Sequence, residues 1–387
     1  MKVAIFTPTF LPKCSGAEIF HHNLALRLQD RGHEPIVLIP RSLKRRLDSS
    51  PLAPPYETVG FPSHQWSLFK RWPAAAFGLS RWTLGRLQSR HRFDVWHSVV
   101  LSPAGMCFAD WQSRTGVPGL VRAVGDDVPG NPALLPAFAR KALCKAQCIV
   151  SLSEGMTRAL AGLNIREDRI VEISNAVDLQ RFEGCFDREA FLRRHGINGP
   201  VCLCVARNHP QKDLPTLFQA FREFLRDPSR RATLVVAGRG IPDYPVDADL
   251  KSHVRLLENA ASSPLEFPPA ELVAWYRAAD LFVLTSQLEG FSTALVEAMA
   301  AGLPVAGTDV PGIRERVQNG VNGLLRPAGD TAGISATIAR LLANPEERRA
   351  FGKASQQLAR QYSWEQTVNA YESTYKKLQL TANRQSA

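Results

Sequence analysis

The chain alternates short apolar runs with segments of helical periodicity, and this alternation limits its possible folds more than any other feature. The apolar runs VAIFT at 3–7 and EPIVLIP at 34–40 flank a helical segment, 15–32, that ends at a glycine. Strands that are apolar along their whole length are buried on both faces, as in parallel sheets. The sequence therefore predicts parallel sheets covered by helices, the α/β class.

The same alternation begins again near residue 185. Apolar runs at 200–206, 233–238 and 281–286 are separated by helical segments. A chain of 387 residues also exceeds the size of one compact core. We therefore expect two doubly wound, Rossmann-like domains that face one another across a cleft, followed by a closing helix. The predicted bounds are 1–183, 184–362 and 363–387.

The chain is strongly basic, with a net charge of +11, which favours an anionic partner. In the segment 41–93, basic residues mix with large aromatic residues, a combination typical of surfaces that meet anionic membranes. The alternative is a pair of ordinary helices with a solvated basic face. We expect contact with an anionic membrane surface. The aromatic residues concerned are Trp66, Phe69, Trp72, Phe77 and Trp82.

Cysteine usage and the amino-terminal residues predict a cytoplasmic protein. Seven cysteines, an odd number without the spacing of a disulfide framework, indicate a reducing compartment. The first residues enter an apolar run without the features of a signal peptide. No stretch approaches the ~20 apolar residues of a membrane span. We therefore expect a peripheral protein on the cytoplasmic face of the membrane.

Two groups of residues have the composition of a metal site but not its spacing. Cys144 and Cys148 lie one helical turn apart without further His or Cys ligands, so we expect small buried side chains rather than a zinc site. Asp243, Asp247 and Asp249 fall in a predicted loop and are expected to be solvated. No metal is predicted.

Two cations follow the first strand of the second series. Arg207 comes directly after the apolar run 200–206, and Lys212 lies five residues later, before a helical segment. Ligands of open α/β sheets bind at the carboxyl ends of strands, where two cations neutralise a pyrophosphate and the charge it gains as a sugar leaves. Two solvated loop cations are the alternative. Gly238, after the next strand, permits either close approach of the backbone to a ligand or a tight turn.

The most specific pattern is SQLEGFSTALVEAMAAGLPV at 286–305, in which two glutamates bracket the start of a helix. Glu289 falls in a glycine-bearing loop, where a carboxylate accepts hydrogen bonds from sugar hydroxyls. Glu297 lies on the following helix and has the chemistry to hold a ribose diol. Ser292 or Thr293 caps this helix, whose free N–H groups then face an anion. The pattern predicts a site for a nucleotide-sugar.

These segments resemble the motifs of the GT-B retaining glycosyltransferases of family 4, also called glycosyl transferases group 1. The resemblance covers nearly the whole chain and is strongest over 200–330. It implies a GT-B fold in which the final helix crosses back to the N-terminal domain. The matching motifs are SGAE (15–18), SNAVDLQRF (174–182), ARNHPQKD (206–213), EGFSTALVE (289–297), DVPGIRE (309–315), NGVNGLL (319–325) and the final helix from Ser363.

The resemblance implies a role for each matching position of the donor site. Arg207 and Lys212 would bind the diphosphate and Glu289 the transferred sugar, and all three would act in catalysis. Glu297 would bind the ribose. The remaining donor-site positions, which supply backbone amides or a close approach, are Gly16, Gly238, Gly290, Phe291, Ser292, Thr293 and Leu295.

The acceptor side carries a departure from the family pattern. Many members have His-Gly-x-Asp where this chain reads Val124-Gly125-Asp126-Asp127, so the histidine is missing. Asp126 then becomes a candidate for acceptor binding and Asp127 for catalysis. The glycine expected after a strand near 254–257 is also absent, which leaves the nucleotide base open.

The other acceptor-side candidates come from the first series of strands. Ser15, Gly16 and Glu18 belong to the loop that resembles the family's acceptor-side loop. His97 lies in a predicted strand and either faces the acceptor or is a satisfied structural histidine.

We expect a metal-independent, retaining hexosyltransferase that needs no cofactor besides its donor. The donor is a UDP- or GDP-linked sugar, and the acceptor a lipid-linked or other envelope saccharide, such as a polysaccharide or lipopolysaccharide. A GT-B epimerase or hydrolase is the alternative, but it leaves the basic aromatic segment unexplained. A dinucleotide dehydrogenase would need G-x-G-x-x-G after the first strand, which FTPTFLPKCSGAE lacks. No nucleic-acid recognition motif is present, so no nucleic-acid partner is expected.

Overall fold

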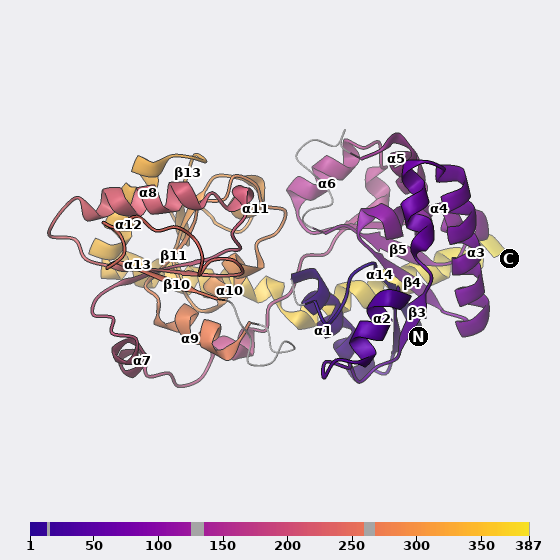
Figure 1. Cartoon of the computed structure of the whole chain (residues 1–387), viewed down its shortest axis with the longest axis horizontal. Coiled ribbons are helices and arrows are strands. Elements are labelled where there is room, and N and C mark those ends of the chain that lie inside the picture. The colour runs from indigo at the N-terminus through magenta and orange to yellow at the C-terminus, as the bar shows by residue number, and fades with distance from the viewer. Residues whose placement is uncertain (14–15, 125–134, 259–267, 387) are drawn as a thin grey trace. The chain divides into compact units, whose positions relative to one another are not determined.

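The computed structural model describes residues 1–13, 16–124, 135–258 and 268–386 and divides the chain into two compact units. Unit 1 comprises Met1–Asn175 with Glu365–Ala387, and unit 2 comprises Ala176–Trp364. Each unit contains one parallel sheet with helices packed around it (Figure 1). The prediction of an α/β protein with two Rossmann-like domains is therefore confirmed.

Unit 1 is built on a seven-stranded parallel sheet in the order β3-β2-β1-β4-β5-β6-β7. This is a doubly wound order, because the direction of strand addition reverses between β1 and β4. The strands are β1 (Lys2–Phe6), β2 (Glu34–Pro40), β3 (Thr58–Phe61), β4 (Val95–Val99), β5 (Gly119–Arg122), β6 (Ile149–Ser151) and β7 (Ile170–Glu172). The helices of this half are α1 (Gly16–Asp30), α2 (Arg41–Asp48), α3 (Pro73–His91), α4 (Met106–Thr115), α5 (Ala137–Leu143) and α6 (Glu154–Ala161).

The basic segment 41–93 folds into α2, β3, a 3₁₀ helix (His64–Lys70) and α3. A pair of helices was the alternative considered for this segment, and β3 was not anticipated. Phe69 packs inside unit 1, while Trp72 and Trp82 remain exposed. Among the described residues, no helix is both long and apolar enough to cross a membrane.

Helix α14 (Trp364–Ser386) closes unit 1 through buried polar contacts. Arg122, at the end of β5, donates from Nε to the hydroxyl oxygen of Tyr371 at 2.7 Å and from Nη2 to Asn175 Oδ1. His97 on β4 is hydrogen-bonded through Nδ1 to the Tyr375 hydroxyl, also at 2.7 Å. A buried guanidinium depends on such partners, so α14 is an integral part of the core of unit 1.

Three buried histidines make unit 1 sensitive to acid. Burial lowers the pKa of His21 and His97 well below 6.5, with a further contribution from Arg122, and lowers the pKa of His22 to about 4. In the unfolded chain each imidazole titrates near its ordinary pKa. Below pH 6.5 the unfolded state therefore binds more protons than the folded state, and stability is lost as the pH falls.

We expect unit 1 to lose about 1.4 kcal/mol of unfolding free energy per pH unit for each of the three histidines below pH 6. In unit 2, burial raises the pKa of Glu297 to about 7, which has the opposite effect between pH 4.5 and 7. Hydrogen exchange read by mass spectrometry, corrected for intrinsic rates, should show protection at pH 5.5 falling in residues 1–175 before residues 176–364. An equal fall in both units would contradict the prediction.

Unit 2 contains a six-stranded parallel sheet in the order β10-β9-β8-β11-β12-β13. Helices α8 and α12 pack on one of its faces, where Cys202 and Cys204 belong to the same apolar cluster. The strands are β8 (Val201–Val205), β9 (Thr233–Ala237), β10 (Val254–Leu257), β11 (Leu281–Leu284), β12 (Val305–Thr308) and β13 (Gly323–Arg326). The helices are α7 (Arg188–Arg194), α8 (Leu214–Leu225), α9 (Ala270–Ala278), α10 (Thr293–Ala300), α11 (Pro311–Arg314), α12 (Thr331–Ala343) and α13 (Pro345–Ala359).

Candidate active site

The candidate site lies where the strand order of unit 2 reverses, at the carboxyl ends of the neighbouring strands β8 and β11. At such a reversal the connections leave to opposite faces of the sheet, and ligands bind in the opening between them. The loop after β8 carries Arg207 and Lys212, and the loop after β11 carries Glu289. The topology therefore brings these predicted residues to one edge of the sheet.

Hydrogen bonds to backbone carbonyls hold the loops after β8 and β11 together. The Gln287 N–H donates to the Gln211 carbonyl at 2.9 Å. The Thr285 hydroxyl is within hydrogen-bond distance of the carbonyls of Lys212 (3.2 Å) and Asp213 (3.0 Å). The loop after β8 therefore has a fixed path past the end of β11.

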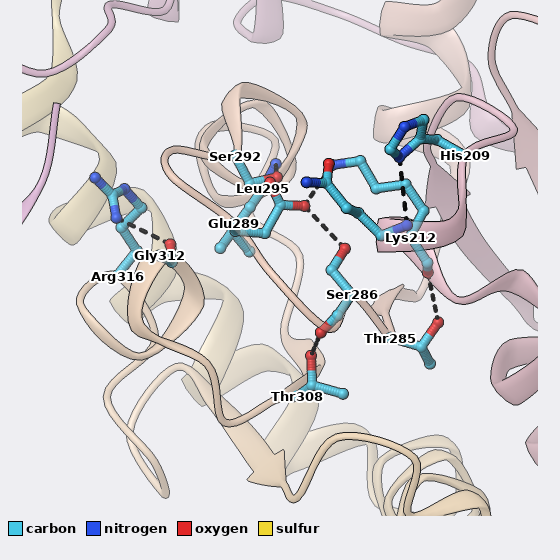
Figure 2. A network of polar contacts seen from close by, with 11 residues as sticks. His209, Lys212, Thr285, Ser286, Glu289, Ser292, Leu295, Thr308, Gly312 and Arg316 are labelled. Carbon is cyan, nitrogen blue, oxygen red and sulfur yellow. Dashed lines mark hydrogen bonds and ion pairs between the residues drawn. The ribbon is translucent and has the colours of Figure 1, made fainter. Parts of the chain in front are cut away.

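Lys212 and Glu289 form an ion pair across the two loops, and Figure 2 shows the Ser286 hydroxyl directed at the same carboxylate. Ser286 Oγ donates to Glu289 Oε1 at 2.8 Å. The side chains of Lys212 and Glu289 are only 17% and 6% exposed. An ion pair so poorly solvated is screened less than a surface pair, so these two charges act strongly on an anion or a hydroxyl placed beside them.

The loop that carries Glu289 is braced from behind by the segment after β12. The Thr308 hydroxyl donates to the Ser286 carbonyl at 2.5 Å. Gly312 lies so close that a Cβ there would be 2.3 Å from the Glu289 carbonyl oxygen. Arg316 donates from Nη1 to the Gly312 carbonyl at 2.9 Å, and its guanidinium lies 4.0 Å from the centre of the Phe291 ring. These contacts set the position of the Glu289 backbone.

Helix α10 begins immediately after this loop, and Ser292 is its N-cap, so the choice left open between Ser292 and Thr293 is settled. Ser292 Oγ accepts a hydrogen bond from the Leu295 N–H at 3.4 Å. The Leu295 amide is therefore directed at the cap. The first turn of a helix carries partial positive charge, which suits a phosphate.

Glu297 is more deeply buried than expected for a residue that binds a ribose at the protein surface. It is 2% exposed and accepts a hydrogen bond at Oε2 from the Tyr276 hydroxyl at 2.8 Å. Burial raises its pKa to about 7, although the Tyr276 hydrogen bond and nearby Arg181 act in the opposite direction. The sequence did not point to Tyr276 as its partner. The proposed ribose contact would have to use the other carboxylate oxygen.

Gly238 makes a close approach, but to the backbone of the residue that follows β8. Its φ is +153°, and a Cβ there would lie 2.0 Å from the carbonyl oxygen of Ala206. Because Gly238 has no side chain, the end of β9 can lie against Ala206. The next residue, Arg207, is half-buried. Its contact with a ligand stays a prediction.

The acceptor-side candidates belong to unit 1 and are placed unevenly. Gly16 is exposed at the first residue of α1, whereas Glu18 is buried and pairs with Lys13, Nζ to Oε1, at 3.5 Å. His97 is fully buried against α14, which favours the structural alternative over contact with an acceptor. The other three candidates, Ser15, Asp126 and Asp127, lie outside the described residues.

Several residues of the site were not anticipated from the sequence: Ser286, Thr285, Thr308, Gly312 and Arg316. Thr285 and Thr308 act through hydrogen bonds to residues distant in the chain, whereas Ser286 and Arg316 bond residues three and four positions away. Small polar residues after strands are too common for the sequence to single these out. Gly312 had a usable signal, because it lies in the DVPGIRE motif beside a proline.

The two groups considered as metal sites have other contacts. Arg222 pairs with both Asp247 and Asp249, so these carboxylates are ion-paired rather than simply solvated. Cys148 is buried and Cys144 half-buried, and both are free thiols. Within the described ranges, no three His, Cys, Asp or Glu side chains gather as metal ligands.

Several curated relatives match only part of the chain. The D-inositol 3-phosphate glycosyltransferase of Frankia alni is 35% identical over 217 residues, which cover 54% of this chain and 53% of that protein. The chain thus spans about half the length of this relative. The N-acetyl-alpha-D-glucosaminyl L-malate synthase of Bacillus anthracis is 25% identical over 377 residues, which cover 95% of both chains.

Solved structures with the same fold cover nearly the whole chain. HepE of Anabaena, solved in complex with UDP, aligns with a TM-score of 0.75 at 20% identity, over 98% of this chain and 99% of that one. A glycosyltransferase from Rickettsia africae aligns with a TM-score of 0.78 at 17% identity, over 97% and 98% of the two chains.

Two family descriptions match adjacent parts of the chain. Residues 15–176 match the glycosyl transferase 4-like domain, and residues 187–358 match the glycosyl transferases group 1. The second range contains the ion pair of Lys212 and Glu289 and the helix that follows it. The two halves of the chain therefore belong to glycosyltransferase domain families, and the second half to the glycosyl transferases group 1.

Proposed function

We propose that this protein transfers a hexose-type sugar, with retention of anomeric configuration, from a nucleoside-diphosphate sugar to a lipid-linked or other envelope saccharide. The observation that carries the donor half of the proposal is the ion pair of Lys212 and Glu289 at the carboxyl ends of β8 and β11. It supplies a cation for the diphosphate and a carboxylate for sugar hydroxyls within one poorly solvated site.

The charges divide the work of the reaction. As the bond between sugar and phosphate breaks, negative charge grows on the diphosphate, and the Lys212 ammonium is placed to stabilise it. The first turn of α10 adds partial positive charge from backbone N–H groups. The Glu289 carboxylate accepts hydrogen bonds from the sugar and orients its anomeric carbon toward the acceptor hydroxyl, which attacks it. The leaving phosphate takes the proton of that hydroxyl.

UDP is the first nucleotide to test. HepE of Anabaena has been solved with UDP and with UDP-glucose, and its fold covers nearly the whole of this chain. For the present protein we expect one nucleoside diphosphate among UDP, GDP and ADP to stabilise the fold by roughly 2.7 kcal/mol at 100 times its dissociation constant. Thermal unfolding with these nucleotides, and with CMP and NAD for comparison, measures the effect. Stabilisation by NAD alone would contradict the assignment.

A transfer assay distinguishes this reaction from the alternative of epimerisation or hydrolysis. With the donor labelled in its sugar, transfer places the label on a lipid-linked saccharide, hydrolysis releases free labelled sugar, and epimerisation leaves it on the nucleotide. We expect label in the lipid fraction. Release of free sugar at the same rate with and without acceptor would favour the hydrolase.

The membrane part of the proposal rests on a stripe of exposed residues on α3 and just before it. Trp72, Leu79 and Trp82 are 61%, 43% and 60% exposed, and their spacing of seven and three residues places them on one face of a helix. Arg71 lies over the Trp72 ring at 5.9 Å, and Arg86 over the Trp82 ring at 5.6 Å. Tryptophan beside arginine suits the boundary between lipid headgroups and acyl chains.

Replacing Trp72 and Trp82 by serine should weaken binding to anionic vesicles by about tenfold for each tryptophan, because each loses on the order of 1.4 kcal/mol of apolar burial. Flotation with vesicles containing phosphatidylglycerol, at low and moderate salt, measures the loss. Leu380→Ser is the matched control, since Leu380 is 62% exposed on α14, outside the stripe. Equal flotation of the wild type and the double variant would remove support for the membrane contact.

A further inference from the structure

Unit 1 contains a cavity of about 670 Å³ that is formed by residues of unit 1 alone. Its walls come from the end of α4, the residues that precede β6 and β7, and helix α14. It therefore lies at the amino ends of these strands, whereas ligand sites of doubly wound sheets lie at the carboxyl ends. Its volume is within the range of small-molecule sites.

The lining of this cavity carries an excess of positive charge. Four cations, Lys145, Arg166, Arg169 and Lys377, face one carboxylate, Asp168. Arg166 is neutralised by Asp168, with Nε to Oδ1 at 3.0 Å and a second bond from Nη2. Lys145 has a carboxylate oxygen of Asp110 only at 3.8 Å. Positive charge that the protein does not balance favours an anion in the cavity.

Two of these cations are particularly suited to an anionic ligand. Arg169 donates from Nη1 to the carbonyls of Cys144 (3.2 Å) and Ala146 (3.3 Å), which hold the guanidinium in place. Among the described residues, its Nε and Nη2 make no hydrogen bond, and the Lys377 ammonium makes no ion pair. Arg169 therefore presents N–H donors in a fixed position. Lys377 adds one positive charge on a flexible side chain, as in many phosphate sites.

One part of the cavity wall carries no charge. Cys148, Val171 and Leu378 line it, and burial raises the pKa of the Cys148 thiol to about 12, so the thiol is neutral. Gln112 braces the wall beside Cys148, because its amide donates to the Gly119 carbonyl at 2.8 Å and to the Gln147 side chain at 3.1 Å. A ligand that fits has an anionic group for the cations and an uncharged body for these uncharged residues.

We propose that this cavity binds the phosphate group of a small phosphorylated molecule, at a site separate from the one on β8 and β11. Lys377 and Arg169 contact the phosphate, and the uncharged part of the molecule lies on Cys148, Val171 and Leu378. The cavity then acts as a binding site for an effector rather than for the donor. This inference goes beyond the proposed transfer reaction and does not depend on it.

Calorimetric titration with inorganic pyrophosphate tests the site, carried out on the full chain with Lys212→Gln so that the unit 2 site is weakened. We expect saturable binding whose Kd rises at least about tenfold in Lys377→Gln and in Arg169→Gln, through loss of a charge-assisted contact. Lys376→Gln, an exposed neighbour on α14 that does not line the cavity, should leave the Kd unchanged.

The remaining outcomes are equally definite. Lys377 is exposed, so its variant should fold normally even if Arg169→Gln does not. No saturable binding, or binding that Lys377→Gln leaves unchanged, would overturn the proposal. Flotation of Lys377→Gln with phosphatidic acid vesicles separates a free phosphate ester from a lipid headgroup. Unchanged flotation supports the soluble ligand, and lost flotation overturns it.

Discussion

Lys212→Gln is expected to lower the rate of sugar transfer by roughly 10²–10³-fold, the cost of removing one pre-placed charge from a transition state. The Lys212 ammonium is ion-paired with the Glu289 carboxylate at the edge of the sheet where the diphosphate is proposed to bind. Without this cation, the charge that develops on the leaving diphosphate loses its nearest partner. The change should also abolish stabilisation by the nucleoside diphosphate in thermal unfolding.

Two variants define what the Lys212 result means. Lys353→Gln removes the same charge from an exposed position on α13 of the same unit and should leave both measurements unchanged. Glu289→Gln keeps the shape of the carboxylate but not its charge, and it should lower transfer while retaining nucleotide binding. If Lys212→Gln transferred sugar at the wild-type rate, the Lys212 charge would not contribute to the transition state.

Gly312→Ala is expected to lower kcat by about a hundredfold, the typical cost of displacing a catalytic group by ~1 Å. The added Cβ would lie 2.3 Å from the Glu289 carbonyl oxygen and 2.7 Å from its carbonyl carbon. Both atoms belong to backbone, so the loop that carries Glu289 must move. Kinetics with the donor at saturation, scaled to the folded fraction, measure the change.

Gly323→Ala provides the matched control for Gly312→Ala. Its Cβ would lie 2.4 Å from the Val305 carbonyl, a clash of the same kind in the same unit. Gly323 and Val305 begin β13 and β12, at the edge of the sheet opposite the candidate site. Both variants should lower the melting temperature, but only Gly312→Ala should lower kcat. Equal kcat values for the two would show that Gly312 does not position Glu289.

The fold was largely predictable because the composition of each buried strand indicates whether both of its faces are covered. Strands such as Val201–Val205 are apolar throughout, which signals a parallel sheet with both faces covered. The edge strand Thr58–Phe61 was missed because it is only partly buried and lacks a continuous apolar run. The cap at Ser292 was predictable as one of two candidates, since N-capping depends on local geometry.

The sequence could predict only those features of the site that follow from the order of the strands and the loops between them. Residues after neighbouring parallel strands must meet at one edge, so Lys212 and Glu289 could be assigned to one site. The burial of His97 and the pairing of Glu297 with Tyr276 depend on side chains from distant elements. A sequence pattern gives the position of such residues but not what covers them. For the same reason, the sequence left Gly238 as either a close approach to a ligand or a tight turn and did not identify its backbone neighbour, Ala206.

The division of unit 1 between two ends of the chain has a consequence for synthesis. The ribosome makes residues 1–175 first, then all of unit 2, and only afterwards the helix that covers His97 and Arg122. Unit 2 is continuous and is complete before that helix exists. A nascent chain therefore carries an uncovered polar and aromatic surface on its first half throughout translation of its second half. A chain truncated at residue 364 should contain a folded unit 2 beside a unit 1 that still binds chaperones.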